Sequence, residues 1–430
     1  MPLLYRSPVQ RRPSAILGTW TATVSGLTAI RFGRRGWTPL VAGVPAIASA
    51  IGATRYCLLQ CNKMLELEVL GAYPAEYQPR QLHYLGWAGG FSGARFWKVE
   101  CSAGQFCLRR WPAEHPTDGQ LALIHAILKW AAQRGCHFVP VPRVTRQGHT
   151  VVVCGGSRWE LSPWMPGKAD YCECPSRAKL EAAMEALATF HRAVADFPWP
   201  RSTSLAEGLA GSGEGAMGPS PGLAQRLEKL KRWPAELLAD IRGRFADTAW
   251  SELVPWAERA LSLARQAIPA VQSLVAEAAH LAVRLQPCLG DVWHDHVLFT
   301  GQSVTGLVDF GSVRWDTVAC DVARLLGSLV LDDPSGWQTG LAAYERVAGP
   351  LDAAQRHLVE VFDRSTVVLA PLNWIEWVFL QKRQFENRLA IAERMRQWVA
   401  RLEVLVRGGG RHPVGCYPPS SGFYGCLQLP

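Results

Sequence analysis

The hydropathy pattern changes character near residue 160, and this change constrains the fold more than any other feature of the sequence. Residues 81–160 contain short apolar runs of strand character separated by glycine-containing turns. One helical pattern interrupts these runs at residues 118–134, with Pro116 and Thr117 before it and Gly135 after it. We therefore expect three strands, a helix and two strands. The strand candidates are LHYLGWA, ARFWKVE, QFCLRRW, HFVPVPRV and TVVVCGG.

The chain beyond residue 160 is mostly helical in pattern. A Gly- and Ser-rich break at residues 202–221 is typical of a surface loop. Between Gln286 and Gly311 the helical spacing gives way to two apolar segments joined at Thr300–Gln302, which predicts a β-hairpin. The helical segments lie near residues 176–197, 222–246, 255–285, 316–331, 351–383 and 386–407.

The length of 430 residues exceeds what one hydrophobic core usually holds, so we expect two lobes in an α+β chain. A small lobe with an antiparallel sheet and one helix would occupy residues 63–160. A larger, mostly helical lobe would occupy residues 161–407. Residues 1–62 have an atypical, Arg-rich composition and are interpreted as a disordered or dispensable leader, and residues 408–430 as a Gly/Pro-rich tail.

Composition narrows the possible partners. The formal charge of +9 is concentrated partly near the start of the chain, and no Lys/Arg run or aromatic stripe accompanies it, so we expect no nucleic-acid partner. The uncharged run Trp37–Thr54 is broken by Pro39 and Pro45, which disfavours a membrane span. The 12 cysteines are scattered without paired zinc spacing, so we interpret them as reduced residues of a cytoplasmic protein. The sequence indicates no particular oligomeric state.

The segment CLGDVWHDHVLFTGQSVTGLVDFG carries the strongest chemical signal. In this segment Asp291 and Asp309 are eighteen residues apart, with the predicted hairpin between them. We therefore expect both carboxylates to lie together at the open end of the hairpin. Phosphoryl transfer needs one carboxylate to position the acceptor hydroxyl and another to hold the Mg²⁺ that neutralises the phosphates. Asp291 and Asp309 match these two needs.

This segment resembles the aminoglycoside phosphotransferase family and related small-molecule kinases, which carry H-G-D, an Asn five residues later, and a strand that ends in Asp beside Phe. The resemblance implies a two-lobed, protein kinase-like fold and ATP-dependent transfer of the γ-phosphate to a hydroxyl of a small molecule. It assigns Asp291 to catalysis and Asp309 to Mg²⁺. Leu289 replaces the family's His, and His296 replaces its metal-binding Asn. An imidazole at this position either favours Mn²⁺ over Mg²⁺ or, with His294, forms hydrogen bonds around the loop.

Upstream segments resemble the nucleotide-binding parts of the same family. LGWAGGFSGARFWKV resembles the first hairpin, whose glycine turn covers the triphosphate, and QFCLRRWP resembles the third strand with its basic residue. WELSPWMPG resembles the hinge that binds adenine, and His191 and Asp321 match positions that support the catalytic loop. The residues to which the resemblance gives a nucleotide-binding role are Gly89, Gly90, Gly93, Arg109, Glu160 and Ser162.

The sequence leaves two functions open. The first is an active kinase whose acceptor is an aminoglycoside-like sugar, an amino alcohol or a sugar derivative. The second is a degenerate kinase-fold protein that binds nucleotide or another ligand without turnover. The second is favoured by Leu289, by His296 and by the predicted helix at 118–134, which offers Gln120 and His125 where the kinase pattern has a Glu to pair with Arg109.

Overall fold

The structure is a computed structural model that describes residues 64–86, 93–199, 216–234, 237, 241–245, 250–383, 385 and 387–408. These residues belong to one compact unit, Cys61–Pro430. The leader expected at residues 1–62, with its uncharged run, and the tail beyond Gly408 lie outside the described residues. None of the helices in the described part of the chain is long and apolar enough to cross a membrane.

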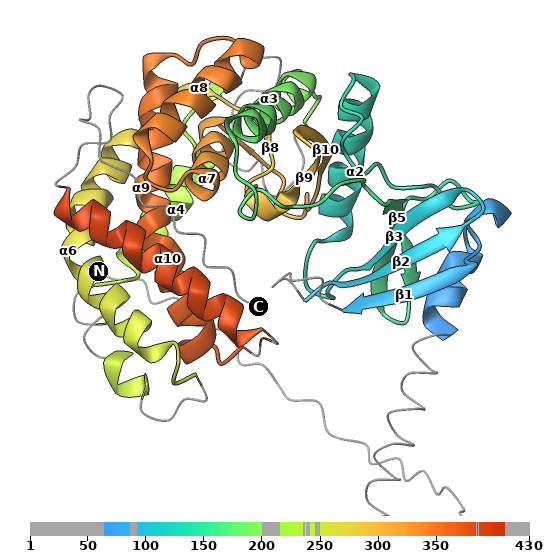
Figure 1. The fold of residues 1–430 in the computed structure, drawn as a ribbon, viewed down its shortest axis with the longest axis horizontal. Coiled ribbons are helices and arrows are strands. Elements are labelled where there is room, and N and C mark those ends of the chain that lie inside the picture. The colour runs from blue at the N-terminus through green and yellow to red at the C-terminus, as the bar shows by residue number, and fades with distance from the viewer. Residues whose placement is uncertain are drawn as a thin grey trace, which may run out of the picture. The chain divides into compact units, whose positions relative to one another are not determined.

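A five-stranded antiparallel sheet forms the first part of the fold, in the strand order β1-β2-β3-β5-β4 (Figure 1). Three strands, helix α2 and two strands follow one another along the chain, as the sequence predicts. The helix begins at the N-cap Thr117, whose hydroxyl accepts from the backbone N–H of Gln120. The bounds are β1 Gln81–Gly86, β2 Arg95–Cys101, β3 Gly104–Arg110, α2 Asp118–Gln133, β4 Val152–Cys154 and β5 Ser157–Pro163.

The strand predicted from HFVPVPRV is wrong. Residues 137–144 form turns and extended chain, because Pro140 and Pro142 have no N–H to donate to a ladder. The last strand is instead β5, which contains the first residues of the segment that resembles the hinge.

The two faces of the sheet differ in character because side chains alternate along each strand. On one face Phe106, Leu108, Trp159 and Leu161 are buried against a helix at residues 64–71. The neighbours of these side chains, among them Arg109 on β3 and Glu160 on β5, which pair in the ladder, point to the other face. That second face therefore presents the charged groups expected to meet a nucleotide.

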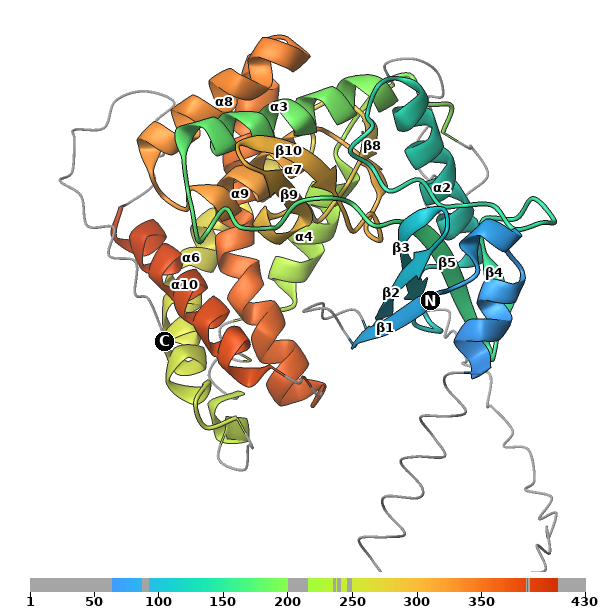
Figure 2. The ribbon, with the colours of Figure 1, turned by 45° about the vertical axis from the view of Figure 1, so that its right-hand side comes forward.

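The second part of the fold is mainly helical. Helices α3 and α8 lie side by side, and α9 packs against α6 and α7 (Figure 2). Helix α10 crosses both α6 and α9. The bounds are α3 Arg177–Val194, α4 Pro221–Lys231, α6 Val254–Ala278, α7 Ala319–Leu329, α8 Pro334–Ala348, α9 Ala353–Ile375 and α10 Arg388–Arg407, with a π-helical turn at Glu376–Leu380 and short 3-10 turns at Ala75–Tyr77, Ile241–Phe245 and His294–His296.

Two helical expectations differ from the structure. Helix α8 is absent from the sequence prediction, because Gly336 and Gly340 weaken its helical pattern, although Asp333 caps it through the N–H groups of Ser335 and Gly336. The helix expected at 222–246 ends at Lys231 in α4. Pro234 follows within three residues and cannot continue a helix.

The predicted hairpin is confirmed as β9 Val297–Thr300 and β10 Ser303–Leu307, with Thr300 paired to Ser303. A second short sheet pairs β8 Gln286–Cys288 with β11 Arg314–Asp316, and a third pairs β6 Met217–Gly218 with β7 Val283–Arg284. Asp291 follows the end of β8 and Asp309 follows the end of β10. Each aspartate therefore lies directly after a strand that is paired in a sheet.

Candidate active site

The loops that carry Asp291 and Asp309 approach each other at a glycine. Gly290 has a φ of 80°, and a β-carbon there would lie 2.3 Å from the carbonyl oxygen of Ser312. Any larger residue would push the two loops apart. Asp309 itself has a φ of 62°, a conformation in which Asp and Asn are strongly enriched among non-glycine residues. The backbone therefore brings the loop of Asp291 and the loop of Asp309 into contact.

Asp291 is a charged, half-exposed carboxylate. Its Oδ1 accepts a hydrogen bond of 2.9 Å from Nε of Arg324 on α7, and 55% of its side chain is exposed. Burial acts to raise the pKa of Asp291, but Arg324 and then His296 together lower it below its usual value. A carboxylate that is ionised at neutral pH can accept the hydrogen bond of an acceptor hydroxyl.

Asp309 forms an ion pair with Arg109, the residue predicted to bind phosphate. Nη2 of Arg109 on β3 donates to Asp309 Oδ1 at 3.0 Å, and Nε2 of His296 lies 3.7 Å from Asp309 Oδ2. The guanidinium of Arg109 stacks on Trp111, 3.3 Å from the ring centre. Burial acts to raise the pKa of Asp309, but Arg109 and then His296 lower it below its usual value. The carboxylate is thus ionised and ready to hold a cation.

His296 occupies the position expected to bind metal, but one nitrogen of its ring already accepts a hydrogen bond. Trp293 Nε1 donates to His296 Nε2 at 2.7 Å. A ring nitrogen that accepts a hydrogen bond has no lone pair left for a metal. His296 Nδ1 is buried and makes no hydrogen bond among the described residues. Ligation by Nε2 would therefore require the indole of Trp293 to turn away.

The remaining donor set fits Mg²⁺ with Asp309 as its protein ligand. Mg²⁺ commonly binds one or two carboxylates and takes its other oxygens from water and substrate phosphates. Asp309 offers such a carboxylate, with 42% of its side chain exposed.

The loop that carries Asp291 is anchored by Asp321 on α7. Its carboxylate accepts from the backbone N–H of Leu289 at 2.6 Å and of Gly290 at 2.8 Å, and from His191 Nε2 at 3.1 Å. His191 Nδ1 in turn lies 2.8 Å from the hydroxyl of Tyr344. The predictions that Asp321 anchors this loop and that His191 supports it are confirmed.

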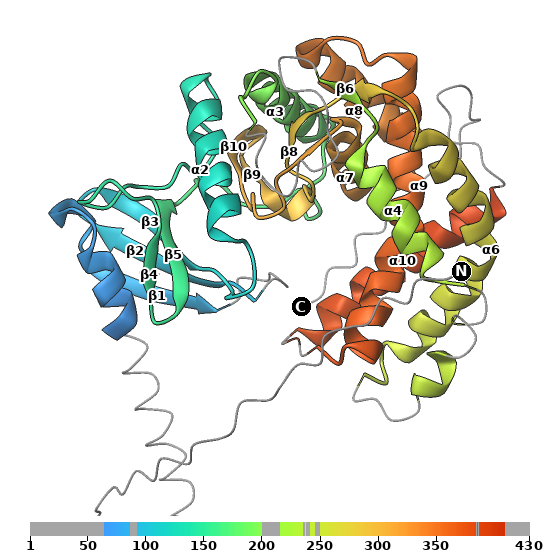
Figure 3. The ribbon, with the colours of Figure 1, turned by 180° about the vertical axis from the view of Figure 1, so that it is seen from behind.

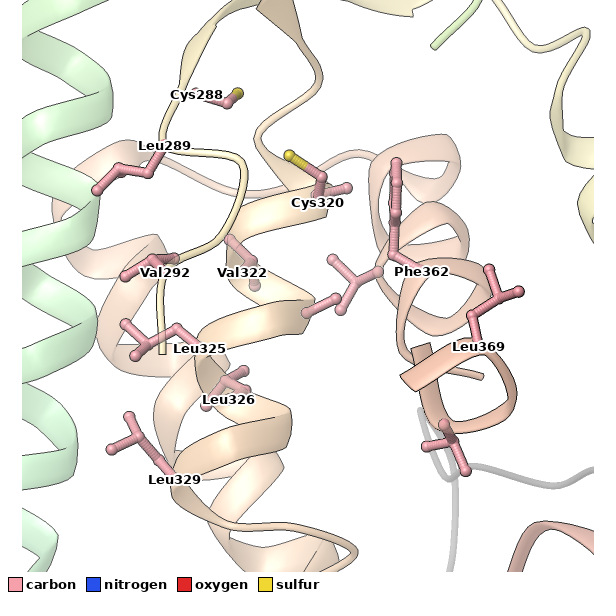
Figure 4. Close-up of a cluster of buried hydrophobic side chains, with 14 of the residues drawn as sticks. Cys288, Leu289, Val292, Cys320, Val322, Leu325, Leu326, Leu329, Phe362 and Leu369 are labelled. Atoms are coloured by element: carbon pink, nitrogen blue, oxygen red, sulfur yellow. The ribbon is translucent and has the colours of Figure 1, made fainter. Parts of the chain in front are cut away.

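Leu289 occupies the position of the His in the family's H-G-D pattern. Its side chain is fully buried, and it belongs to the same cluster of buried hydrophobic side chains as Val292, Val322 and Leu325 (Figure 4). The hydrophobic side chain thus fixes the loop by packing, while the backbone N–H of the same residue is fixed by Asp321.

The structure describes some of the predicted nucleotide-binding residues and not others. Gly89 and Gly90 lie outside the described residues, and Gly93 has a φ of 83° just before β2. Glu160 and Ser162 lie in β5 with buried side chains. Their adenine-binding role stays a prediction.

The Glu160 carboxylate is fixed inside the small lobe. Its Oε2 accepts from Trp111 Nε1 at 2.9 Å and from His125 Nε2 at 2.8 Å. Helix α2 therefore contributes His125 as a partner of Glu160. In the kinase pattern the corresponding helix contributes a glutamate, which pairs with the basic residue at the position of Arg109. Sequence reasoning missed Trp111 as a partner of both Arg109 and Glu160, although it lies two residues from Arg109.

The phosphotransferase enzyme family matches residues 84–357 of this sequence. The chain belongs to this family. A relative is the homoserine kinase of Brucella anthropi, which is 26% identical over 324 residues, or 74% of this chain and 86% of the relative. The family and the two-part kinase-like fold predicted from the sequence are both confirmed.

Two solved structures share the fold of this phosphotransferase. Spectinomycin phosphotransferase in complex with ADP and spectinomycin has a TM-score of 0.55 at 10% identity, covering 80% of this chain and 97% of the other. Amicoumacin kinase in complex with AMP-PNP and Ca²⁺ has a TM-score of 0.53 at 12% identity, covering 81% and 93%. The phosphotransferase thus has the kinase-like fold of these structures, in which the sheet forms the first lobe and the helices the second.

Replacing Asp321 is expected to destabilise the phosphotransferase and slow its turnover. Asp321→Ala would leave two buried backbone N–H groups and His191 without an acceptor, which costs about 3 kcal/mol of unfolding free energy. Urea unfolding measures this loss. Asp352→Ala is the matched control, because Asp352 caps α9 through the N–H of Gln355, a contact worth about 1 kcal/mol. Equal losses in the two variants would contradict the anchoring role.

Glu160→Gln is expected to lower stability at neutral pH by about 2 kcal/mol, because Trp111 and His125 donate to the same oxygen of Glu160, and a neutral amide oxygen accepts these two hydrogen bonds without the charge assistance that the carboxylate gives. Burial acts to raise the pKa of Glu160, but His125, together with Arg109 and Trp111, lowers it below its usual value. The stabilisation is therefore complete above the unfolded pKa of about 4.3 and is lost as the pH falls through the lower folded pKa. Urea unfolding between pH 3 and 7 should show this loss in the parent protein, and an equally steep loss in Glu160→Gln would contradict it.

Proposed function

We propose that this phosphotransferase transfers the γ-phosphate of ATP to a hydroxyl of a small molecule, with Asp291 as the catalytic carboxylate. The observation that carries the proposal is the arrangement of two ionised carboxylates on adjacent loops, each held by an arginine from a different element: Arg324 for Asp291 and Arg109 for Asp309. Phosphoryl transfer depends mainly on positioning and on compensation of charge, and these four groups provide both.

Each residue has a distinct task in the proposed reaction. The acceptor oxygen forms a bond to the γ-phosphorus, the bond from this phosphorus to the β,γ-bridging oxygen breaks with ADP as the leaving group, and the acceptor proton passes to Asp291. Asp291 accepts the hydrogen bond of the hydroxyl and so aims the acceptor oxygen. Arg109, which does not titrate near neutral pH, compensates the charge of the triphosphate together with the predicted N–H groups of Gly89, Gly90 and Gly93.

Asp309 is the proposed ligand of Mg²⁺, and His296 is its proposed second ligand once Trp293 has turned away. A bound Mg²⁺ neutralises phosphate oxygens and lowers the barrier to transfer. Mn²⁺ accepts an imidazole ligand more readily than Mg²⁺ does, so activity with Mn²⁺ should equal or exceed that with Mg²⁺ if His296 ligates.

The relatives support a nucleotide substrate and a range of acceptors. The names of the relatives include kinases of homoserine, of spectinomycin and of amicoumacin, and two of these proteins hold ADP or AMP-PNP. We propose the acceptor to be a hydroxyl-bearing metabolite or sugar derivative of comparable size. The packed Leu289 and the Trp293–His296 hydrogen bond favour the alternative, a protein that binds nucleotide without turnover.

A coupled assay tests the proposal. ATP should raise the melting temperature of the full-length protein, and Mg²⁺ or Mn²⁺ should increase this shift. Hydroxyl-bearing acceptors should then release ADP in proportion to a new phosphoester. Nucleotide binding that never yields a phosphoester with any acceptor of these classes would favour the alternative.

A further inference from the structure

Trp111 is the residue directly after β3, and its ring is buried next to the residues predicted to bind the nucleotide. Its backbone N–H donates to the carbonyl of Arg158 at 2.8 Å, which extends the pairing of β3 with β5 by one residue. Side chains alternate along a strand, so Trp111 and Arg109 project from the same face. The side chain of Trp111 is therefore fixed beside Arg109 by the sheet itself.

The guanidinium of Arg109 lies on the face of this ring. Its central carbon is 3.3 Å from the ring centre of Trp111 and 5.2 Å from the ring centre of Phe96 on β2. A guanidinium that stacks on an aromatic face keeps the N–H groups at its edge available for hydrogen bonds. One of them, Nη2, donates to Asp309, and the buried Nε makes no hydrogen bond among the described residues. Arg109 therefore retains hydrogen-bonding capacity while it is paired with Asp309.

The edge of the same ring lies against the loop that carries Asp309. A β-carbon on Gly311 would be 3.3 Å from Cζ3 and 3.4 Å from Cη2 of Trp111, so the absence of a side chain at this glycine makes room for the indole. The carbonyl of Gly311 also lies 3.2 Å from Nε2 of His115. Trp111 thus contacts both the arginine and the loop of the aspartate with which this arginine pairs.

The indole N–H fixes the orientation of the ring. Trp111 Nε1 donates to Glu160 Oε2 at 2.9 Å, and the same oxygen lies 2.8 Å from His125 Nε2. His125 Nδ1 lies 2.7 Å from the hydroxyl of Thr150. His125 projects from α2, which lies beside β3 and β5 in Figure 3. Tilting the ring would break a buried hydrogen bond to a charged group, so this chain of contacts holds the indole in one orientation.

We propose that Trp111 is a positioning residue for nucleotide binding, whose ring holds the Arg109 guanidinium in place for the phosphates whether or not Asp309 is paired with it. This inference rests on the proposed function, in which Arg109 binds the triphosphate and Asp309 is released to hold the metal ion. An arginine that loses its carboxylate partner regains side-chain freedom, which phosphate binding would have to remove again. The stack on Trp111 is independent of Asp309 and keeps that freedom small.

Calorimetry of the full-length protein with ATP and with adenosine, without metal or acceptor, tests the proposal. Trp111→Leu should weaken the binding of ATP about tenfold, since a cation–π contact of a desolvated arginine is worth about this factor. Adenosine has no phosphates, so its binding should not change. Equal weakening of ATP and adenosine, or an unchanged affinity for ATP in the folded variant, would overturn the proposal.

Trp130→Leu is the matched control for the loss of a tryptophan. Trp130 lies on α2, in the same lobe, and its ring also stacks on an arginine, with Arg134 3.7 Å from the ring centre. ATP affinity should be unchanged in this variant. If Trp111→Leu fails to fold, Trp111→Phe takes its place: it keeps a stacking ring without the indole N–H and should lose about threefold in ATP affinity. An unchanged affinity in Trp111→Phe would then overturn the proposal.

A double-mutant cycle with Arg109→Ala shows whether Trp111 acts through Arg109. Contacting residues that act together have non-additive effects, so Trp111→Leu should cost little further ATP affinity once Arg109 is alanine. A ring that only supports the fold of the lobe would weaken ATP binding by the same factor in both backgrounds. A second tenfold loss in the double variant would therefore overturn the assignment.

These binding measurements fail separately from the proposed function. The expected pattern of ATP affinities, without a phosphoester on any acceptor, would keep the role of Trp111 and contradict the kinase activity. Phosphorylation of an acceptor with an unchanged ATP affinity in Trp111→Leu would keep the kinase activity and overturn the role of Trp111. Absence of ATP binding by the parent protein would overturn both.

Discussion

Asp291→Asn is expected to lower kcat by about 10³-fold while nucleotide binding is retained, because an amide cannot take the proton of the acceptor hydroxyl. The substitution preserves the shape of the side chain, and the loop keeps its anchors to Asp321 through Leu289 and Gly290. The fold and the nucleotide lobe should therefore be intact. Steady-state kinetics with a phosphorylated acceptor measure kcat, and the nucleotide-dependent thermal shift measures binding.

Asp295→Asn is the control for this variant. Asp295 lies on the same loop, 45% of its side chain is exposed, and it pairs with Arg394 on α10, 3.1 Å away. Its ion pair is a surface contact of small energetic weight, so kcat should change little. Comparable losses in Asp291→Asn and Asp295→Asn would show that the loop as a whole, and not the Asp291 carboxylate, limits turnover.

Asp309→Asn is expected to lower kcat by about 10³-fold and to raise the Mg²⁺ concentration needed for half-maximal activity, since Asp309 is the proposed metal ligand. Asn tolerates the positive φ of this position, so the backbone is not strained by the change. Titration of activity with Mg²⁺ and with Mn²⁺ measures the effect.

Asp309→Ala separates charge from conformation at the same site. Ala is disfavoured at a φ of 62°, so this variant should lose stability in addition to activity, whereas Asp309→Asn should melt near the parent protein. A metal dependence that is unaltered in both variants would contradict the role of Asp309.

The approach of the two loops that carry Asp291 and Asp309 was predictable because the information is local. A hairpin of known turn length joins the two loops, and its register is confirmed by the pairing of Thr300 with Ser303. The direction of Arg110 was predictable for the same reason, since strand alternation sends it to the face opposite Arg109, where it donates to Ser157.

The partners of these residues were not predictable, because they come from distant parts of the chain. Arg109 is 200 residues from Asp309, and Arg226 is 140 residues from Thr366. Neither pairing leaves a periodic trace in the sequence. Helix α8 was missed for another reason: Gly340 lies close enough to α7 that a β-carbon would be 2.3 Å from Leu326, so tertiary packing selects a residue that local propensity disfavours.

The most direct test of the central claim is phosphorus NMR of the full-length protein incubated with ATP, Mg²⁺ and a hydroxy acid such as L-homoserine or glycerate. The arrangement of Asp291 with Arg324 and of Asp309 with Arg109 predicts a new phosphoester signal that grows in step with ADP, and its absence in Asp291→Asn. Conversion of ATP to ADP and inorganic phosphate without a phosphoester, or nucleotide binding with no conversion on any hydroxyl-bearing acceptor, would contradict the claim.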